Sequence, residues 1–355
     1  MNPLSQLISF IIVTYNSAND IGRCLDSVFQ QPYRPFEVVI YDNASQDATA
    51  KLVEDRYPQA IFIRGETNLG FAEGNNRAVA HAHGEILVFI NPDTYVDDDF
   101  LAPMVDFLNS CSEAGAVTPA IMVAGKENVL NAYGNCVHVS GMTYCYQYGR
   151  PNYLKEPFEI SAISGAAFAM RRELFLKLGG FETSFFMYYE DTDLSLRIRL
   201  EGYKIFVIPR SVIYHAFKEQ FHPNKIFYLE RNRYLSILSL FPFRVLLLMM
   251  PSLMMVELIT WGYCLMKGEP ALVAKLNSWR DIRLKVKWIR DRSKYFSTKK
   301  NTLPFVLGVF DEQLELRYVG GGRLAHLASF AAWVSAIPFW AVKRLLSLKH
   351  RLLRG

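Results

Sequence analysis

The sequence has few cysteines and lacks the glycine-rich motifs that bind phosphate groups. Its five cysteines are odd in number and none has C-x-x-C spacing, which argues against a disulfide framework or a zinc site and fits a reducing cytoplasm. Neither G-x-x-x-x-G-K-[ST] nor G-x-G-x-x-G occurs, so a P-loop and a dinucleotide-binding site are unsupported. The opening MNPLSQLISFIIVTYN has no basic start and only a short apolar run. We therefore expect a buried strand there rather than a signal peptide.

Acidic and basic residues are unevenly distributed along the 355 residues. Residues 1–240 hold 20 Lys/Arg and 27 Asp/Glu, a net charge of −7, whereas residues 241–355 hold 19 and 7, a net charge of +12. The basic residues of the second part flank long apolar runs, which favours an anionic membrane surface over nucleic acid as its partner. We predict two domains, an acidic, catalytic-looking one over 1–240 and a basic, hydrophobic, helical, membrane-associating region over 241–355.

Strand-like and helix-like patterns alternate through the first 115 residues. The expected strands are Leu7–Thr14, Phe36–Tyr41, Ala60–Arg64 and Glu85–Asn91. Helices are expected from an Asn19 or Asp20 cap to Gln30, after a cap at Ser45, and over Gly70–His83. This alternation predicts an α/β fold, with a mostly parallel sheet flanked by helices. Further along, we expect short strands and hairpins over 115–170, helices at Arg172–Leu178 and Thr192–Glu201, and strands at Lys204–Ile208 and Val212–His215.

Two long apolar stretches, Val245–Met266 and Leu324–Val342, lie in the second part. The first is long enough to span a bilayer, but Pro251 and Glu257 interrupt it. If it crossed the membrane, the basic loop Lys275–Lys300 would lie outside, against the positive-inside tendency. We therefore prefer helices in the cytoplasmic interface, or a re-entrant hairpin, over a spanning helix. A buried helical subdomain is the alternative.

Polar side chains follow three of the expected strands. The strands end in Thr14-Tyr15-Asn16, Asp42-Asn43-Ala44-Ser45 and Asn91-Pro92-Asp93-Thr94. Each group alone fits turn chemistry, but ligands of open α/β sheets bind beyond the carboxyl ends of the strands. Asp93, after a buried strand and a proline, suits a hard divalent cation that also binds phosphates. The three groups together predict a ligand site at this sheet edge.

Three carboxylates, Glu190, Asp191 and Asp193, stand close together in FFMYYEDTDLSLRIRL. Acids at the start of a helix interact favourably with its dipole, so helix capping explains their position. Capping does not explain the aromatic residues beside them, namely Phe185, Phe186, Tyr188 and Tyr189. We therefore prefer the hypothesis that one acid is a base for chemistry, next to an aromatic acceptor pocket.

Five ordered blocks resemble the family 2 glycosyltransferases of the GT-A (Rossmann-like) fold, and more narrowly the bacterial rhamnosyltransferases of O-antigen and cell-wall polysaccharide assembly. The blocks, within about residues 7–240, are SFIIVTYNSANDIGRCLDSV, VVIYDNASQDAT, NLGFAEGNNRAV, ILVFINPDTYV and GGFETSFFMYYEDTDLSLR. The resemblance implies an inverting hexosyltransferase that moves a sugar from a nucleotide-diphosphate donor to a lipid-linked, polyprenyl-diphosphate saccharide. It further implies a peripheral or monotopic protein at the cytoplasmic face of the inner membrane. The best guess is L-rhamnose from dTDP-rhamnose. Galactofuranose, glucose or N-acetylhexosamine from a UDP donor are the alternatives.

The resemblance also implies roles for individual residues. Asp191 matches the family's catalytic base, with Glu190 and Asp193 supporting it or orienting the acceptor. Asp93 and His215 would hold Mg²⁺ or Mn²⁺, although Asn91 stands where the family's D-x-D motif has its first acid. Asp42 would accept from the pyrimidine N3–H. The full set of implied donor-binding residues is Thr14, Tyr15, Asn16, Asp42, Asn68, Gly70, Asn76, Asn91 and Gly165.

Two other functions are weighed against this one. A nucleotide-sugar pyrophosphorylase usually opens with a glycine-rich, Arg/Lys-containing loop after the first strand, and Thr14–Asp20 contains no such loop. A non-catalytic membrane scaffold with a degenerate transferase domain is disfavoured because Asp42, Asp93 and Asp191 are all present. The enzyme therefore remains the preferred hypothesis.

Overall fold

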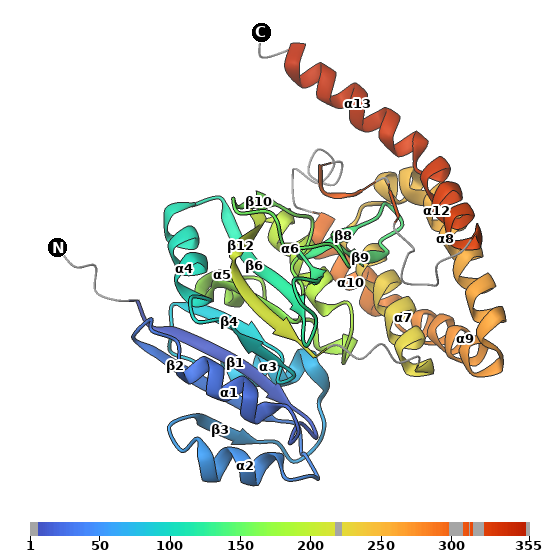
Figure 1. Ribbon diagram of the computed structural model, residues 1–355. Helices are drawn as coiled ribbons and strands as arrows, with labels where there is room; N and C mark the ends of the chain where they lie inside the picture. The colour runs from blue at the N-terminus through green and yellow to red at the C-terminus, as the bar shows by residue number, and fades with distance from the viewer. Residues whose placement is uncertain (1–5, 217–221, 298–307, 312, 315–322, 353–355) are drawn as a thin grey trace. The chain divides into compact units, whose positions relative to one another are not determined.

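The computed structural model describes residues 6–216, 222–297, 308–311, 313–314 and 323–352, and the chain forms two compact units (Figure 1). The first comprises residues 1–135 and 145–219, and the second comprises 136–144 and 220–355. The boundary falls before residue 240 because helix α7 (Pro223–Leu240) packs against α9 (Glu269–Leu284) and α10 (Val286–Ser297) of the second unit.

A ten-stranded sheet forms the centre of the first unit. Its main path runs β10-β12-β6-β11-β4-β1-β2-β3, with β5 paired to β12 and β7 to β6. Neighbours among β4, β1, β2 and β3 are parallel, as are β6 and β12, whereas β11 runs antiparallel between β4 and β6. The strands are β1 (Ile8–Thr14), β2 (Phe36–Asp42), β3 (Ile61–Arg64), β4 (Ile86–Ile90), β5 (Thr94–Val96), β6 (Ala114–Val123), β7 (Leu130–Ala132), β10 (Phe158–Glu159), β11 (Ala167–Arg171) and β12 (Lys204–His215).

Helices cover both faces of this sheet because its central strands are apolar throughout. Every residue of β1 and of β4 is buried. One face packs against apolar residues of α1 (Ile21–Phe29), α2 (Thr49–Arg56) and α4 (Leu101–Ser110). The other meets α3 (Gly70–Val79), α5 (Arg172–Lys177) and α6 (Glu190–Leu200), with Phe89 stacked on Phe168 at 4.5 Å between ring centroids. The mixed α/β fold with a mostly parallel central sheet is therefore confirmed.

Several local predictions are corrected. Ser45 does not cap α2, because its hydroxyl donates to Asp42 instead. Helix α3 ends at Val79 rather than His83, and α6 begins at Glu190, two residues earlier than expected. The two strands expected over 204–215 are one strand, β12, whose pairing register shifts between Ile208 and Val212.

The second unit is helical. It contains α7, α8 (Phe243–Lys267), α9, α10, α12 (Arg323–Ser335) and α13 (Ile337–Leu352), with residues 136–144 of the short hairpin β8 (Asn135–Val137) and β9 (Thr143–Cys145). Where described, the basic segment Lys275–Lys300 forms helices α9 and α10, so the expectation of a loop was wrong. The stretch Leu324–Val342 is broken into α12 and α13 next to Pro338. Within the described residues, α8 is the one helix whose length and composition would suit a membrane crossing.

Candidate active site

The ends of β1 and β2 are tied together by Asp42. Its Oδ1 accepts hydrogen bonds from the hydroxyls of Thr14 (2.8 Å) and Ser45 (2.5 Å), and its Oδ2 accepts from the Ser45 backbone N–H. Thr14 and Asp42 are fully buried. In this conformation neither side chain offers surface to a nucleotide base, and both support the turn. Their contacts to the donor stay a prediction.

Tyr15 and Asn16 are the exposed members of the first predicted group. The Tyr15 side chain is 49% exposed, and Asn16 adopts a left-handed backbone conformation with φ of 51°. The Asn16 N–H donates to Ser45 Oγ, and its amide oxygen accepts from the Gln46 N–H. This arrangement leaves the Tyr15 ring as the surface that a base or ribose could contact.

The loop before α3 is held by asparagine amides. Asn68 Oδ1 accepts a hydrogen bond from the Gly70 N–H. Asn43 Oδ1 accepts from the Leu69 N–H, and Asn43 Nδ2 donates to the Gly70 carbonyl. Asn43 is buried with both amide atoms engaged, so the formal sequon Asn43-Ala44-Ser45 does not present a glycosylation site. Gly70 has φ of 83°, and a Cβ there would clash with the Phe186 carbonyl oxygen.

Asn76 binds protein backbone. Its amide donates to the Phe181 carbonyl and accepts from the Phe181 N–H, both at 2.9 Å. These two bonds fix the segment that leads from Gly179-Gly180 into the acidic cluster. In this structure the Asn76 amide has a positioning contact, and its binding of the donor stays a prediction.

Asp93 and His215 come together although 122 residues separate them. Asp93 follows β4 and His215 ends β12, which pairs with β5 directly after Asp93. His215 Nε2 lies 3.2 Å from Asp93 Oδ2, and its Nδ1 lies 3.4 Å from Asn131 Oδ1. The side-chain oxygen of Asn91 is buried and has no hydrogen-bond partner among the described residues.

Asp191 is anchored on both carboxylate oxygens at the first turn of α6. Oδ2 accepts from the Gly165 N–H at 2.8 Å and from Asn135 Nδ2 at 3.4 Å, and Oδ1 accepts from the Thr192 N–H. Burial raises the pKa of Asp191, and the hydrogen bonds from Gly165 and Thr192 oppose that rise. Because Gly165 and Asn135 are far away in sequence, this contact is more than helix capping. Asn135 was not foreseen, since an isolated asparagine at the start of a short strand carries no sequence signal.

The two neighbouring acids have different environments. Glu190 is buried, its Oε2 has no hydrogen-bond partner among the described residues, and burial, with the nearby Asp191 charge, raises its pKa well above the ordinary value. Asp193 is fully buried and paired with Arg197 at 2.8 Å. Asp193 therefore has no surface for an acceptor in this conformation and is held by an internal ion pair, and its role in supporting the base stays a prediction.

The backbone leading into α6 is strained. Phe186, Tyr188 and Tyr189 have φ of 65°, 65° and 74°, a left-handed conformation that is unfavourable for bulky residues and clusters at functional sites. Phe185 and Tyr189 are buried in the core, whereas Phe186 and Tyr188 are half-buried. Only the latter two could line an acceptor pocket.

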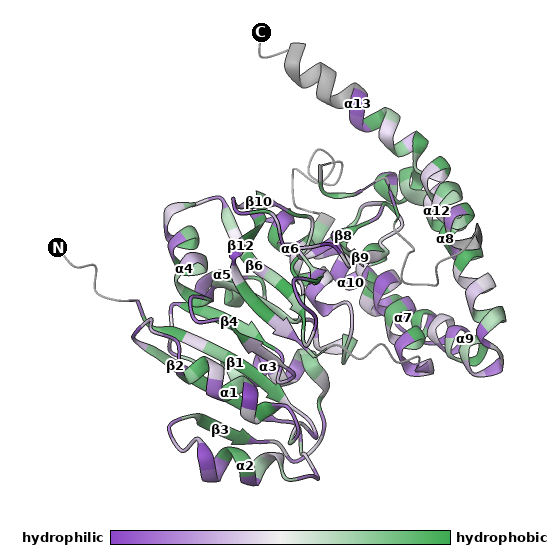
Figure 2. Cartoon of the chain, in the orientation of Figure 1, coloured by the Kyte–Doolittle hydropathy of each residue, from purple (hydrophilic) through white to green (hydrophobic). Residues whose placement is uncertain are grey.

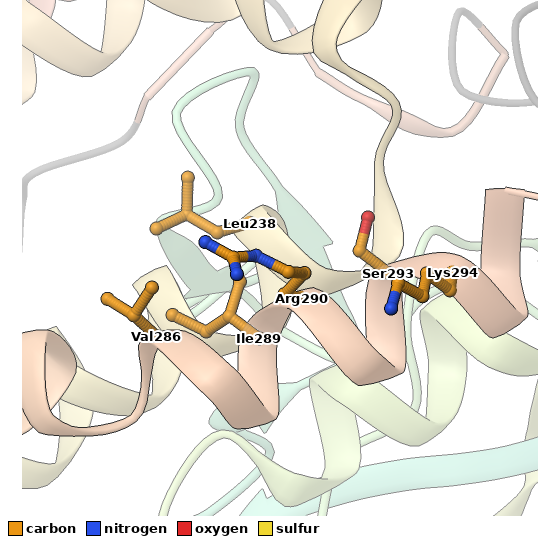
Figure 3. A pocket seen from close by; sticks show the side chains of 6 residues that line it. All are labelled: Leu238, Val286, Ile289, Arg290, Ser293 and Lys294. Carbon is orange, nitrogen blue, oxygen red and sulfur yellow. The ribbon is translucent and has the colours of Figure 1, made fainter.

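A cavity of about 360 Å³ lies in the helical unit (Figure 3). It is lined by Leu238, Val286, Ile289, Arg290, Ser293 and Lys294. None of the predicted site residues lines it, so the candidate active site rests on the side chains at the sheet edge and not on this cavity.

Two family models match the chain. Residues 9–179 match the model described as glycosyl transferase family 2, and residues 151–222 match the one described as the N-terminal domain of galactosyltransferase. The chain is 25% identical over 236 residues to the N-acetylglucosaminyl-diphospho-decaprenol L-rhamnosyltransferase of Mycobacterium tuberculosis, covering 60% of this chain and 76% of that one. It is 26% identical over 207 residues to the poly-beta-1,6-N-acetyl-D-glucosamine synthase of Staphylococcus epidermidis, but spans only 48% of that relative.

Solved structures share the fold at low sequence identity. GalNAc-T7 with UDP, GalNAc and Mn²⁺ aligns with a TM-score of 0.59 at 18% identity, covering 84% of this chain and 58% of that one. S. aureus TarS 1–349 in complex with UDP-GlcNAc aligns with a TM-score of 0.56 at 18% identity, covering 92% and 88%. These likenesses establish the GT-A fold.

Proposed function

Since the chain contains a glycosyltransferase family 2 domain and is a glycosyltransferase that uses a nucleotide sugar, we propose that it inverts the donor's anomeric centre and transfers the sugar to a lipid-linked saccharide. L-Rhamnose from dTDP-rhamnose is the preferred donor sugar, and a polyprenyl-diphosphate saccharide is the preferred acceptor. The mycobacterial relative, whose name specifies both a rhamnosyl transfer and a diphospho-decaprenol substrate, supports this choice. The proposed location is the cytoplasmic face of the membrane.

The observation that carries the proposal is the setting of Asp191. Its carboxylate is half-buried, held by Gly165 and Asn135, and has a raised pKa, which suits a general base that takes a proton near neutral pH. In the proposed step, Asp191 removes the proton of the acceptor hydroxyl as that oxygen bonds to C1 of the sugar. The bond from C1 to the diphosphate oxygen breaks on the opposite face, and the diphosphate leaves with the electron pair.

A divalent cation, Mg²⁺ or Mn²⁺, fits the donor set at the end of β4. The described residues offer no group of three His, Cys, Asp or Glu ligands, but Mg²⁺ is often held by one or two carboxylates together with substrate phosphates. Asp93 and His215 would hold the cation, and the unpartnered Asn91 oxygen is a further ligand of suitable chemistry. Once bound, it would supply positive charge to the departing diphosphate. The fold neighbour crystallised with UDP and Mn²⁺ supports this choice.

The remaining residues have positioning roles in this account. Tyr15 offers its exposed ring to the nucleotide, and Asn16, Thr14 and Asp42 fix the turn that carries it. Gly165 directs its N–H at the proposed base. Phe186 and Tyr188 are the half-buried aromatics available to an acceptor sugar.

A second candidate function is transfer of an N-acetylhexosamine from a UDP donor. It is favoured by the staphylococcal relative, a poly-N-acetylglucosamine synthase, and by the TarS structure with UDP-GlcNAc. Both functions use the same residues for proton removal and differ in the donor.

The test is a donor screen on the full chain. We expect dTDP-rhamnose, with Mg²⁺ or Mn²⁺, to raise the melting temperature more than other nucleotide sugars, and to release dTDP only when a polyprenyl-diphosphate N-acetylglucosamine is added. Release of UDP from UDP-N-acetylglucosamine with that acceptor would instead favour the second candidate. No nucleotide-diphosphate release with any donor would contradict both and favour a non-catalytic scaffold.

A further inference from the structure

One face of α8 carries a row of exposed apolar side chains. The row consists of Phe243, Leu247, Met250, Met254, Leu258 and Leu265. They recur at three- or four-residue steps with one step of seven, which is the spacing of a single helix face. At 1.5 Å per residue the row is about 33 Å long. Contiguous apolar surface of this kind marks an interaction site on a folded protein.

Helix α12 also carries exposed apolar side chains. It packs against α8, and Ser335 Oγ lies 3.4 Å from Ser252 Oγ. Leu327, Phe330 and Trp333 of α12 are exposed as well. Figure 2 shows hydrophobic residues along most of both helices, in contrast to the more hydrophilic α9. The helical unit therefore has exposed apolar side chains on α12 as well as on α8.

A different face of α8 is occupied by a buried ion cluster around Glu257. Glu257 accepts from Tyr234 Oη (2.7 Å) and Trp279 Nε1 (3.1 Å), and Lys275 Nζ lies 3.0 Å away. Lys275, fully buried, also pairs with Glu230 at 2.5 Å. Glu257 thus links α8 to α7 and α9. Although Glu257 interrupts the apolar run in the sequence, its side chain does not lie among the exposed apolar side chains of the row.

This cluster argues against a membrane-spanning α8. Because α9 packs along α8, a spanning α8 would take α9 to the same depth. Helix α9 carries exposed Arg280 and Arg283 besides the buried Lys275, and cationic side chains at mid-bilayer are strongly unfavourable. A helix lying in the interface can bury its apolar row and leave α9 in water.

The charge around the row identifies an anionic bilayer as its partner. Exposed Arg244 and Lys267 stand near the two ends of α8. Arg344 of α13 stacks on Trp340 at 4.8 Å from the ring centroid, a cation and aromatic pair suited to the headgroup level. The net charge of +12 over residues 241–355 has the sign that attracts anionic lipid.

We propose that α8 lies in the plane of an anionic bilayer, with the apolar row from Phe243 to Leu265 at the acyl boundary, as a monotopic anchor. This deepens the proposed function, on which it rests for the lipid-linked acceptor. It selects the in-plane arrangement over a spanning helix. It also leaves α9 and the ion cluster on the aqueous side.

The test compares the full chain with its Met254→Asp/Leu258→Asp variant. Both residues are more than 60% exposed, so the change is expected to leave the melting temperature intact. We expect co-sedimentation with vesicles of equal parts phosphatidylcholine and phosphatidylglycerol to weaken by roughly tenfold or more, since two buried apolar contacts are lost. Leu176→Asp, at a leucine that is 50% exposed on α5 of the other unit, is the control and should bind as the parent does.

Three results would overturn the proposal. The variant could bind vesicles as tightly as the parent, or the parent could resist extraction by alkaline carbonate, as a spanning protein does. A parent dimer that the variant makes monomeric, with unchanged vesicle binding, would identify a second copy as the occupant. An assay with a short-chain, water-soluble acceptor separates membrane binding from catalysis. The variant should still release the nucleotide diphosphate in that assay. If the parent released none, that result would count against the proposed function alone.

Discussion

At the scale of single residues, the chemistry depends on how three adjacent acids are kept different. Asp191 is hydrogen-bonded from Gly165 and Asn135, Asp193 is paired with Arg197, and Glu190 is buried with an unpartnered oxygen among the described residues. The three carboxyl groups therefore have three different environments within four positions. Environment, rather than residue type, selects Asp191 as the candidate base.

Asn135→Ala tests whether the Asn135 side-chain amide lowers the pKa of the proposed base, Asp191. Removing the donor to Asp191 Oδ2 should raise the pKa of Asp191 further, because the hydrogen bond favours the charged form. The acid limb of the kcat/KM profile is then expected to move to higher pH, since turnover requires the carboxylate. At 3.4 Å the bond is long, so its loss should cost about 1 kcal/mol or less.

A purely structural role for Asn135 would lower turnover at every pH without moving the limb, and that outcome would count against this account. Asn109→Ala, an exposed asparagine on α4, is the control and should leave both the limb and the turnover unchanged.

Glu190→Gln should stabilise the fold increasingly as pH rises. The folded pKa of Glu190 lies well above the ordinary value because of burial. The parent therefore loses stability as pH rises from the unfolded pKa through the folded one, by about 1.4 kcal/mol for each unit of difference. Glutamine does not titrate, so the difference in melting temperature between variant and parent should be larger at pH 8 than at pH 5. The exposed Glu156→Gln should show no such trend, and an equal difference at both pH values would refute the burial argument.

At the scale of elements, the start of α6 combines backbone strain with tethering. Three non-glycine residues of Phe186–Tyr189 have positive φ, and the chain around them is fastened by Asn76 and by the Ala72 N–H bond to the Phe186 carbonyl. Strain of this kind persists only where the surroundings hold it. Helix α3 is therefore part of the site's support although it contributes no charged side chain to it.

Asn76→Ala should destabilise this support. It removes both hydrogen bonds to the Phe181 backbone and leaves those groups unpaired, which should lower the free energy of unfolding by about 2–3 kcal/mol. Urea denaturation measures this directly. Asn68→Ala removes only one such bond and should cost less. If the Asn76→Ala protein were as stable as the parent, the claim that Asn76 holds the Phe181 segment in place would be wrong.

The sequence predicted most elements because their periodicity is local. The strand Leu7–Thr14, which is β1, could be predicted from its unbroken apolar run. The predicted position of Asp93, just after a buried strand, was also correct. Three features could not be predicted, because each depends on residues brought together from distant positions. They are the hydrogen bond from Asn135 to Asp191, the hydrogen bonds between Asn76 and Phe181, and the continuity of strand β12. The prediction for Ser45 was wrong for a local reason, since a serine that caps the next helix and one that donates to an acid three residues earlier look alike in sequence.

At the scale of the whole molecule, each unit has its own kind of core. The core of the first unit is apolar and lies between one sheet and its flanking helices. The second unit has a charged cluster between its helices, formed by Glu230, Arg233, Glu257 and Lys275. Burial raises the pKa of Glu230, but Arg233 and Lys275 outweigh it and hold that pKa below the ordinary value. The sequence showed the charges and the apolar runs but not that Glu257 faces inward.

Lys275→Ala should unfold the helical unit selectively. Removing one partner leaves Glu230 and Glu257 buried without their cation, which typically costs about 3–5 kcal/mol. Differential scanning calorimetry should show a lower melting temperature for the helical unit and little change for the sheet unit. The exposed Lys267→Ala on α8 serves as the control. A single unshifted transition in the Lys275 variant would contradict the buried network.

The most direct measurement of the central claim is the turnover of Asp191→Asn with the donor identified by the screen. Asparagine keeps the shape but cannot take a proton, so nucleotide-diphosphate release should fall by roughly a hundred- to ten-thousand-fold. Donor affinity should stay unchanged, and the exposed Asp98→Asn should keep full activity. Full turnover by the Asp191→Asn protein would contradict the claim that this carboxylate is the base.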